Sequence, residues 1–423
     1  MKYFRQFSIY TLVGFFGAGV SFLLMPYLSH FLKPAEYGIL SMVNSVVTIL
    51  IPLIGLTAAG IINVEYYKQK DRKEFASLFS SVQFIPVLPF FVLVMLSAFL
   101  SDPVARFLEI PGEKSYWVPL SCVLALLTIY FETLIGYNVT EQKPGYFAFF
   151  NILKIVTEVT LTILFITQWG YGWEGRLYAW LISSLILFLA GFIYCKKQYL
   201  LSFRISKKYI KVAVLFGLPL ILHVVGKFVI NQSDRIFITK MVSIAEAGIY
   251  NIGYQVGMIM LLLVNAMGNF MQPFLFERLA SLTESAKRQI VKTSYVIIGS
   301  LLIILVVITV ATPTFFTWLV DESYAKGTRY VFWVGLSYFF WGVYIIFAGY
   351  IFYSGKTGIL GVLAIVNVVL NILLNYFLIK AFGPMGAAYA TCISFFVVSV
   401  IIVWKANRLY PLPWLRFNFS NNR

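Results

Sequence analysis

The sequence predicts an all-α integral membrane protein whose twelve transmembrane helices form two parallel six-helix repeats around a central cavity. Three observations lead to this prediction: an apolar composition, an internal repeat, and basic residues that gather in alternate loops. Hydrophobic residues make up 60% of the 423 positions and charged residues only 12%. Soluble domains carry roughly 25% charged residues, so we expect lipid to be the solvent of this chain.

The repeat is visible as two pairs of matching segments. Ala-Glu-Tyr-Gly-Ile at 35–39 returns as Ala-Glu-Ala-Gly-Ile at 245–249, which is 210 positions later. The pattern Gly-x-x-Gly-x-x-Tyr-Ala occurs at 172–179 and again at 383–390, which is 211 positions later. Both offsets are about half the chain length, and internal repeats are a common construction of membrane transporters.

Apolar segments between polar breaks give the positions of the individual helices. Each segment is about 20 residues or longer, which is enough to cross the roughly 30 Å hydrocarbon core of a bilayer. The predicted spans cover 8–32, 38–63, 77–101, 116–140, 146–168, 175–195, 209–240, 247–273, 290–316, 330–353, 357–379 and 385–405.

The basic residues predict the orientation of these spans. Of the 33 Lys and Arg residues, 22 lie in or beside one alternating set of loops, 8 lie in the other set, and 3 lie within spans. The richer set includes both ends of the chain, so both termini are expected to be cytoplasmic. The basic loop at 196–208 is the expected linker between an N-terminal lobe (1–205) and a C-terminal lobe (206–423). Six spans per lobe give the two lobes the same orientation, with a central cavity between them.

Other classes of protein fit the residues less well. The net charge of +16 would suit a nucleic-acid partner, but the basic residues lie in loops between spans, so none is expected. Three cysteines and two histidines show no metal-ligand spacing. No catalytic motif is present either, so we expect a transporter without an organic cofactor rather than an enzyme.

Ionisable groups at membrane depth are costly and are therefore functional candidates. In the seventh span, His223, Lys227, Asn231 and Asp234 follow a 4-4-3 spacing that places them on one helical face. Arg235 follows about 100° around the helix. Such a face suits a cavity-lining helix of a charge-coupled transporter. The alternative is an ion pair, Lys227 with Asp234 or Asp234 with Arg235, that only joins helices.

The fourth and fifth spans carry three more ionisable groups. Lys154 and Glu158 are spaced i, i+4 on the fifth span, close enough to pair with each other. Glu132 lies at membrane depth in the fourth span without an obvious local partner. These residues line a substrate path in one interpretation and only neutralise charge or join helices in the other.

A stripe of neutral polar residues runs along the eleventh span. Asn367, Asn371 and Asn375 recur at i, i+4 and i+8, and the twelfth span adds Thr391 and Ser394. Such groups often hydrogen-bond helices together. With Asp234 they would also offer hard oxygen ligands to a sodium ion.

Several segments resemble the polysaccharide repeat-unit flippases of the Wzx type, which belong to the MOP superfamily with the MATE drug exporters and the lipid II flippases. The similar segments are Leu-Lys-Pro-Ala-Glu-Tyr-Gly at 32–38, Gly-Leu-Pro at 217–219, Ser-Asp-Arg-Ile at 233–236 and Ala-Gly-Ile-Tyr at 247–250. The resemblance covers the whole chain in length, span count and repeat.

This resemblance implies a MOP-type fold, a place in the bacterial cytoplasmic membrane, and a cargo of undecaprenyl pyrophosphate-linked oligosaccharide for O-antigen or capsule. It implies contact with membrane lipids, and a polysaccharide polymerase and a chain-length regulator as partners. The first span holds no buried Arg or Lys, so other cations must meet the pyrophosphate. The expected substrate-binding residues are Lys154, Lys227, Arg235 and His223.

The resemblance also implies coupling to a H⁺ or Na⁺ gradient. Related flippases place a cation site among spans 7, 11 and 12. The expected residues here are Asp234, Asn371, Asn375 and Thr391, with the carboxylates Glu158 and Glu132 as further candidates; no other metal is expected.

Two alternatives stay open. A MATE-like cation-coupled multidrug exporter should hold more buried carboxylates than cations, whereas spans 4, 5 and 7 hold three of each. A membrane polymerase or ligase of polysaccharides usually needs a long external loop, whereas those at 102–115 and 317–329 are short.

Overall fold

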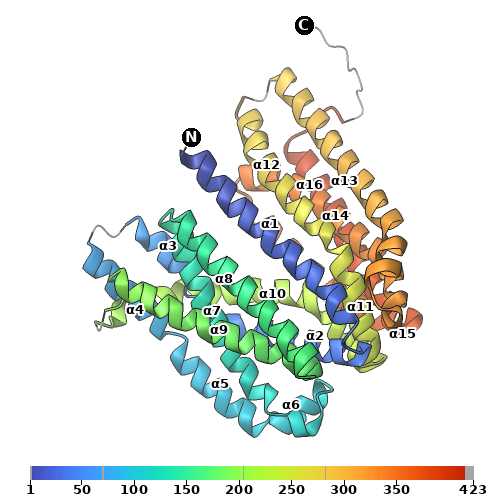
Figure 1. Cartoon of the computed structure of the whole chain (residues 1–423). Coiled ribbons are helices and arrows are strands. Elements are labelled where there is room, and N and C mark those ends of the chain that lie inside the picture. Colours follow the sequence, from blue (N-terminus) through green and yellow to red (C-terminus); the bar gives the residue numbers. More distant parts are fainter. Residues whose placement is uncertain (1, 69–70, 203, 282, 415–423) are drawn as a thin grey trace. The chain divides into compact units, whose positions relative to one another are not determined.

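The computed structural model describes residues 2–68, 71–202, 204–281 and 283–414, and of residues 2–8, 222 and 223 it describes the backbone alone. The described residues form helices joined by short turns (Figure 1). Twelve segments among them are long and apolar enough to cross a membrane. The predicted all-α fold with twelve spans is therefore confirmed. The spans are Ile9–Phe31, Pro34–Gly55, Arg72–Phe99, Gly112–Thr140, Pro144–Gln168, Gly172–Lys197, Lys207–Met241, Ile244–Ser281, Glu284–Leu319, Glu322–Tyr353, Gly358–Phe382 and Met385–Leu409.

The chain divides into two compact units, Met1–Phe228 and Val229–Arg423. The division falls inside helix α10, whereas the lobe boundary expected from the sequence lies at 205/206. Within the first unit, α7 packs against α2, α5 and α9, while α8 packs against α1 and α9. Its elements are α1 (Lys2–Ser29), α2 (Pro34–Gly55), α3 (Gly60–Tyr66), α4 (Arg72–Phe84), α5 (Val87–Phe99), α6 (Ser101–Phe107), η1 (Gly112–Lys114), α7 (Trp117–Thr140), α8 (Pro144–Ile163), the π-helical turn η2 (Leu164–Gln168), α9 (Gly172–Lys197) and the first part of α10 (Lys207–Met241).

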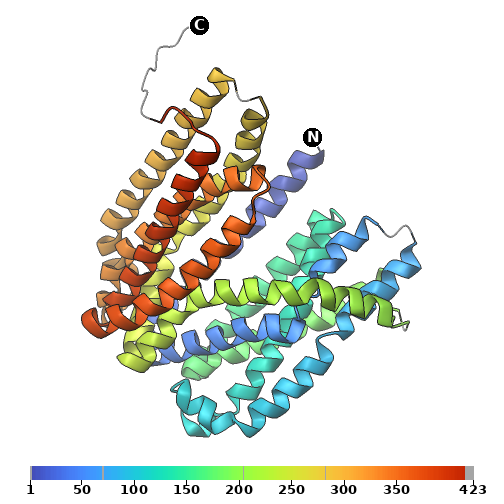
Figure 2. The ribbon, with the colours of Figure 1, turned by 180° about the vertical axis from the view of Figure 1, so that it is seen from behind.

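The second unit is built around α14, which contacts α11, α12, α13 and α16 (Figure 2). α15 packs against α16. The large buried side chains of this unit include the tyrosines Tyr250, Tyr324, Tyr330 and Tyr350. Its elements after α10 are α11 (Ile244–Gly257), α12 (Ile259–Ser281), α13 (Glu284–Leu319), η3 (Glu322–Gly327), α14 (Thr328–Tyr353), α15 (Gly358–Phe382) and α16 (Met385–Leu409).

Three predicted spans are interrupted: 247–273 divides at Met258 between α11 and α12, and two others break for local reasons. The segment predicted at 38–63 ends its helix at Gly55, because Leu56 and Thr57 both adopt left-handed backbone angles (φ of 49° and 48°). The segment predicted at 77–101 is divided between α4 and α5 near Pro86. Proline has no backbone N–H to donate and its ring clashes with the preceding turn.

The sequence repeat has a structural counterpart in each unit. Gly172 and Gly383 both have positive φ, 51° and 59°, where the chain turns into α9 and α16. The second glycine of each pattern lies in a tight contact: a Cβ on Gly175 would lie 3.1 Å from side-chain atoms of Phe165 and Ile166, and a Cβ on Gly386 would lie 2.1 Å from the carbonyl oxygen of Leu378. The tyrosines match as well, with the Tyr178 ring 4.9 Å from that of Trp117 on α7 and the Tyr389 ring 4.7 Å from that of Trp333 on α14. The repeated residues therefore make the same kind of helix start twice.

Candidate functional site

Asp234 is the buried centre of a polar cluster in the second unit. It lies on α10 and its side chain is fully buried. One carboxylate oxygen accepts hydrogen bonds from the Tyr250 hydroxyl at 2.6 Å and the Thr391 hydroxyl at 3.1 Å. The other accepts from the amide nitrogen of Asn375 at 2.9 Å. Helices α10, α11, α15 and α16 therefore converge on one carboxylate.

The amides of α15 extend this cluster. Asn371 and Asn375 are one turn apart on the same helix face, so both reach the neighbouring helices. The Asn371 carbonyl oxygen accepts from the amide of Asn375 at 3.0 Å and from the Ser233 hydroxyl at 3.2 Å. Its own amide nitrogen donates to Thr391 at 3.3 Å. All three asparagines of the predicted stripe are buried, and Asn371 and Asn375 are hydrogen-bonded, whereas the side-chain oxygen of Asn367 has no partner among the described residues.

The three described hydrogen bonds to Asp234 all come from neutral donors, and the Arg235 guanidinium acts on this carboxylate only through space. Arg235, the next residue, directs its guanidinium elsewhere: it donates to Asn251 at 3.0 Å and to the Asn231 carbonyl at 2.6 Å, and it stacks 4.3 Å from the Tyr254 ring centroid. An ionised carboxylate out of water is expensive unless a cation or proton accompanies it. This site is therefore suited to take up a positive charge.

The donor atoms match a proton or a small monovalent cation. Oxygen atoms of Asp234, Thr391, Asn371 and Asn375 surround the site, and the Asn375 carbonyl oxygen has no hydrogen-bond partner among the described residues. No group of three His, Cys, Asp or Glu side chains gathers in the described part of the chain. A single carboxylate with neutral oxygens fits Na⁺ or H⁺ better than a divalent ion, which is usually held by several carboxylates.

The two further carboxylate candidates belong to the first unit, whereas this cluster belongs to the second. Glu158 on α8 forms an ion pair of 2.5 Å with Arg176 on α9, and Arg176 also donates to Thr162 at 3.2 Å. The pairing of Glu158 with Lys154 considered from the sequence is replaced by this contact. Lys154 instead lies 5.0 Å from the ring centroid of Phe131, and Glu132 is exposed.

The residues that the sequence placed on one face of α10 fall on both sides of the division between the two units. Lys227 belongs to the first unit and is exposed, whereas Asp234 and Arg235 belong to the second and are buried. The side chain of His223 lies outside the described residues. The structure thus brings together Asp234, Asn371, Asn375 and Thr391 in the second unit. Of the predicted substrate cations, Lys154 and Lys227 belong to the first unit and Arg235 to the second.

Two partners of the candidate residues were not predicted. Tyr250 makes the shortest described hydrogen bond to Asp234, yet a tyrosine carries no charge that would mark it. Its place directly after the repeated Gly-Ile at 248–249 was the available signal. Arg176 was not singled out from the sequence, and its position inside the repeat 172–179, one turn after a helix start, was the available signal.

A buried carboxylate held by oxygens within a bundle of spanning helices is characteristic of ion-coupled membrane transporters. The chain belongs to the polysaccharide biosynthesis protein family, whose pattern matches residues 4–277. The family resemblance drawn from the sequence, to flippases of the Wzx type in the MOP superfamily, is therefore confirmed.

Two proteins of Haemophilus influenzae are similar along most of their length. The "Lsg locus putative protein 1" is 24% identical over 395 residues, 88% of this chain and 90% of the relative. An "uncharacterized membrane protein" is 26% identical over 373 residues, 84% of this chain and 85% of the relative.

Solved structures share the fold at low sequence identity. The lipid II flippase MurJ in an inward closed conformation gives a TM-score of 0.74 at 14% identity, over 94% of this chain and 87% of MurJ. A multidrug resistance MATE family transporter of the MOP superfamily, in an inward-facing conformation, gives 0.72 at 12% identity, over 93% of this chain and 94% of the transporter. The fold is thus that of MOP-superfamily transporters.

Proposed function

We propose that this chain moves undecaprenyl pyrophosphate-linked oligosaccharides from the inner to the outer leaflet of the bacterial cytoplasmic membrane by alternating access, driven by a H⁺ or Na⁺ gradient. The cargo belongs to surface polysaccharide synthesis, such as O-antigen or capsule. The observation that carries this proposal is the fully buried Asp234 with three neutral donors on spanning helices, in a chain of the polysaccharide biosynthesis family.

The proposed cargo requires a protein because its headgroup is anionic and polar. Such a group cannot cross about 30 Å of hydrocarbon unaided. Lys154, Lys227, Arg235 and His223 are the proposed contacts of the pyrophosphate, since ammonium and guanidinium groups form charge-assisted hydrogen bonds with phosphate oxygens. The exposed position of Lys227 supports its part in this role. The Arg235 contacts with Asn251 and Tyr254 favour a positioning role for that residue.

The proposed coupling site consists of Asp234, Asn371, Asn375 and Thr391. Uptake of a proton or Na⁺ removes the cost of an uncompensated buried charge and tightens the contacts of α10 with α15 and α16. Release would loosen the same contacts. The ion therefore biases the conformation because it binds one arrangement of these helices better than the other.

The first test compares cells that carry the native chain with cells that carry Asp234→Asn. The pool of lipid-linked oligosaccharide at the inner leaflet is measured by mass spectrometry, and the cargo is identified by its mass. We expect accumulation of a completed, unpolymerised repeat unit in the variant, with export reduced at least about tenfold. Asp102→Asn, at an exposed position on α6, is the matched control and should behave as the native chain. Normal export by Asp234→Asn contradicts the proposed coupling role.

The Asp234→Asn variant also distinguishes Na⁺ from H⁺ as the coupling ion. Purified native protein should gain thermal stability in Na⁺ over K⁺ if Na⁺ binds at Asp234, because ligands of the folded state raise its stability. Asp234→Asn should abolish that difference. Equal stability in both salts, together with transport that follows the pH gradient, assigns the site to H⁺.

A second candidate function is cation-coupled export of drugs, which the fold similarity to a multidrug resistance MATE family transporter supports. It predicts an unchanged lipid-linked oligosaccharide pool and increased drug sensitivity in cells that lack the protein.

The proposed membrane orientation and the proposed protein partners follow from the flippase function. The distribution of basic residues favours cytoplasmic termini, and a polysaccharide polymerase and a chain-length regulator are the proposed partners on the outer side.

A further inference from the structure

A lateral groove of about 590 Å³ runs along α13, α14 and α16 in the second unit. Its walls are mostly aromatic and aliphatic and include Phe340 and Phe347 of α14 and Phe396 and Val400 of α16. The volume lies in the range of roughly 300–1,000 Å³ that is common for small-ligand sites. Phe396 and Val400 are 47% and 51% exposed, so the groove opens to the surroundings of the helices.

Two cations stand at one end of this groove. Trp404, which lines the groove near the end of α16, lies with its ring 4.0 Å from the Arg408 guanidinium and 4.8 Å from the Lys405 ammonium. Trp414 is part of the same lining and is fixed by a hydrogen bond of 2.7 Å from the Tyr295 hydroxyl to its carbonyl oxygen. The site therefore combines an apolar channel with a positively charged end.

The length of the groove matches one leaflet of a bilayer. Its lining on α16 extends from Phe396 to Asn407, a rise of about 17 Å at 1.5 Å per residue. Half of the hydrocarbon core is about 15 Å. The excess of basic residues on this side of the spans places the charged end at the cytoplasmic surface.

We propose that this groove binds one anionic phospholipid of the cytoplasmic leaflet. An acyl chain lies along α14 and α16, and the phosphate is held by Arg408 and Lys405, with the Asn407 amide beside them. Arginine suits this role because its planar guanidinium can pair with two phosphate oxygens. A single-leaflet groove fits a resident phospholipid better than a long polyprenyl chain. The inference does not depend on which cargo the chain transports.

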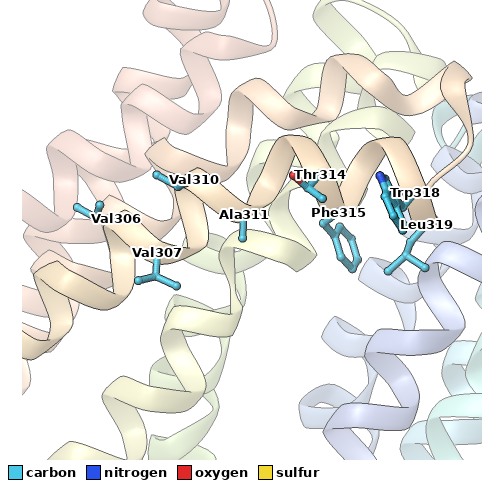
Figure 3. Close-up of a pocket in the computed structure, with 8 residues that line it drawn as sticks. All are labelled: Val306, Val307, Val310, Ala311, Thr314, Phe315, Trp318 and Leu319. Carbon is cyan, nitrogen blue, oxygen red and sulfur yellow. The ribbon is translucent and has the colours of Figure 1, made fainter.

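A second apolar surface provides the contrast. Eight residues of α13, from Val306 to Leu319, border a space of about 690 Å³ (Figure 3). They lie along a single helix and include no Lys or Arg. This surface should contact lipid without preference for the headgroup.

The test is native mass spectrometry of the purified full chain with phosphatidylglycerol and phosphatidylethanolamine of the same acyl composition. We expect the native protein to retain phosphatidylglycerol preferentially. The double variant Arg408→Gln, Lys405→Gln should lose at least about tenfold of that preference, since each basic residue near the surface attracts anionic lipid. The matched control is Lys207→Gln, Lys208→Gln, which removes the same charge from exposed positions at the start of α10 and should keep the preference.

A second pair of variants tests the groove independently of charge. Val400→Trp should fill it and reduce retained phosphatidylglycerol, whereas Val310→Trp on the α13 surface of Figure 3 should not. Equal retention of both lipids by the native protein overturns the proposal. An equal loss of the phosphatidylglycerol preference in the control double variant also overturns the proposal, because it would show that basic residues anywhere on the surface attract anionic lipid. Retention of an undecaprenyl phosphate probe in place of phosphatidylglycerol would assign the groove to a polyprenyl lipid instead.

Discussion

At the scale of single residues, Asp234 has a large desolvation cost because its carboxylate is fully buried. Three donors and complete burial hold the carboxylate in one geometry. Hydrogen bonds offset part of the desolvation penalty, but neutral donors do not supply the missing positive charge. When an ion binds to or leaves such a carboxylate, the strength of its contacts with the neighbouring helices should change. A coupling site needs this property.

The Glu158 carboxylate differs from that of Asp234, because Glu158 forms an ion pair with Arg176. We expect Arg176→Gln to lower the melting temperature of the purified protein, since it removes the ion-pair partner of Glu158. Breaking a fully buried pair typically costs about 3–5 kcal/mol, and the cost here should be smaller because the two side chains are 24% and 15% exposed. The double variant Arg176→Gln, Glu158→Gln should recover most of the loss. Differential scanning fluorimetry in detergent measures both, and a double variant as unstable as the single one contradicts the pairing.

The structure joins Asp234, Asn371, Asn375 and Thr391 in one hydrogen-bonded cluster. The sequence selected these residues through helical spacing, which marked Asp234 and the asparagine stripe, and through the family resemblance, which grouped them with Thr391. It was insufficient for Tyr250 and Arg176. The hydrogen bond of Tyr250 depends on how α11 packs beside α10. The partner of Glu158 depends on α9 lying against α8, and neither packing follows from local spacing.

At the scale of elements, close backbone contacts fix where helices begin and end. Gly217 of α10 lies directly against the left-handed turn after α2: a Cβ there would be 2.0 Å from the carbonyl oxygen of Leu56. The Thr57 hydroxyl donates to the Gly217 carbonyl in the same contact. The position of the α2 end therefore depends on a helix 160 residues away in the chain, which explains why the predicted span 38–63 was too long.

The repeat glycines allow a direct test of such contacts. Gly386→Ala places a methyl group 2.1 Å from the Leu378 carbonyl oxygen, and we expect it to destabilise the fold by about 1–3 kcal/mol through overpacking. Gly361→Ala on α15 is the control, because nothing lies within 4 Å of a Cβ there. It should be neutral or slightly stabilising. Melting curves of the two variants in the same detergent compare them, and equal stability would show that α15 and α16 can separate at no cost.

At the scale of the whole molecule, the uneven distribution of basic residues predicts a single orientation of twelve spans. The number and the approximate limits of the spans were predictable because each needs only an apolar segment of sufficient length. The division between the two units at Phe228 was not, since α10 is continuous through it and its internal proline, Pro219, lies nine residues before it.

The orientation can be tested with single cysteines. The native cysteines Cys122, Cys195 and Cys392 are all buried, so the background should be low. Glu113→Cys, at an exposed site of a predicted external loop, should react with a membrane-impermeant maleimide in intact cells. Lys68→Cys, exposed in a predicted cytoplasmic loop, should react only after permeabilisation. The reverse pattern would invert the orientation.

The duplicated scaffold carries its carboxylate cluster in only one copy. At the repeat offsets of 210 or 211 positions, the counterparts of Asp234, Asn375 and Thr391 in the first half are Leu24, Leu164 and Trp180. On the proposed function, one coupling ion accordingly moves per transport cycle, in addition to the charge of the anionic headgroup. A membrane potential of 100 mV supplies about 2.3 kcal/mol for each charge, which corresponds to an electrical driving ratio of about fifty between the two leaflets. On the proposed function, the number of coupling ions per cycle therefore depends on how far the sequences of the two repeat copies have diverged.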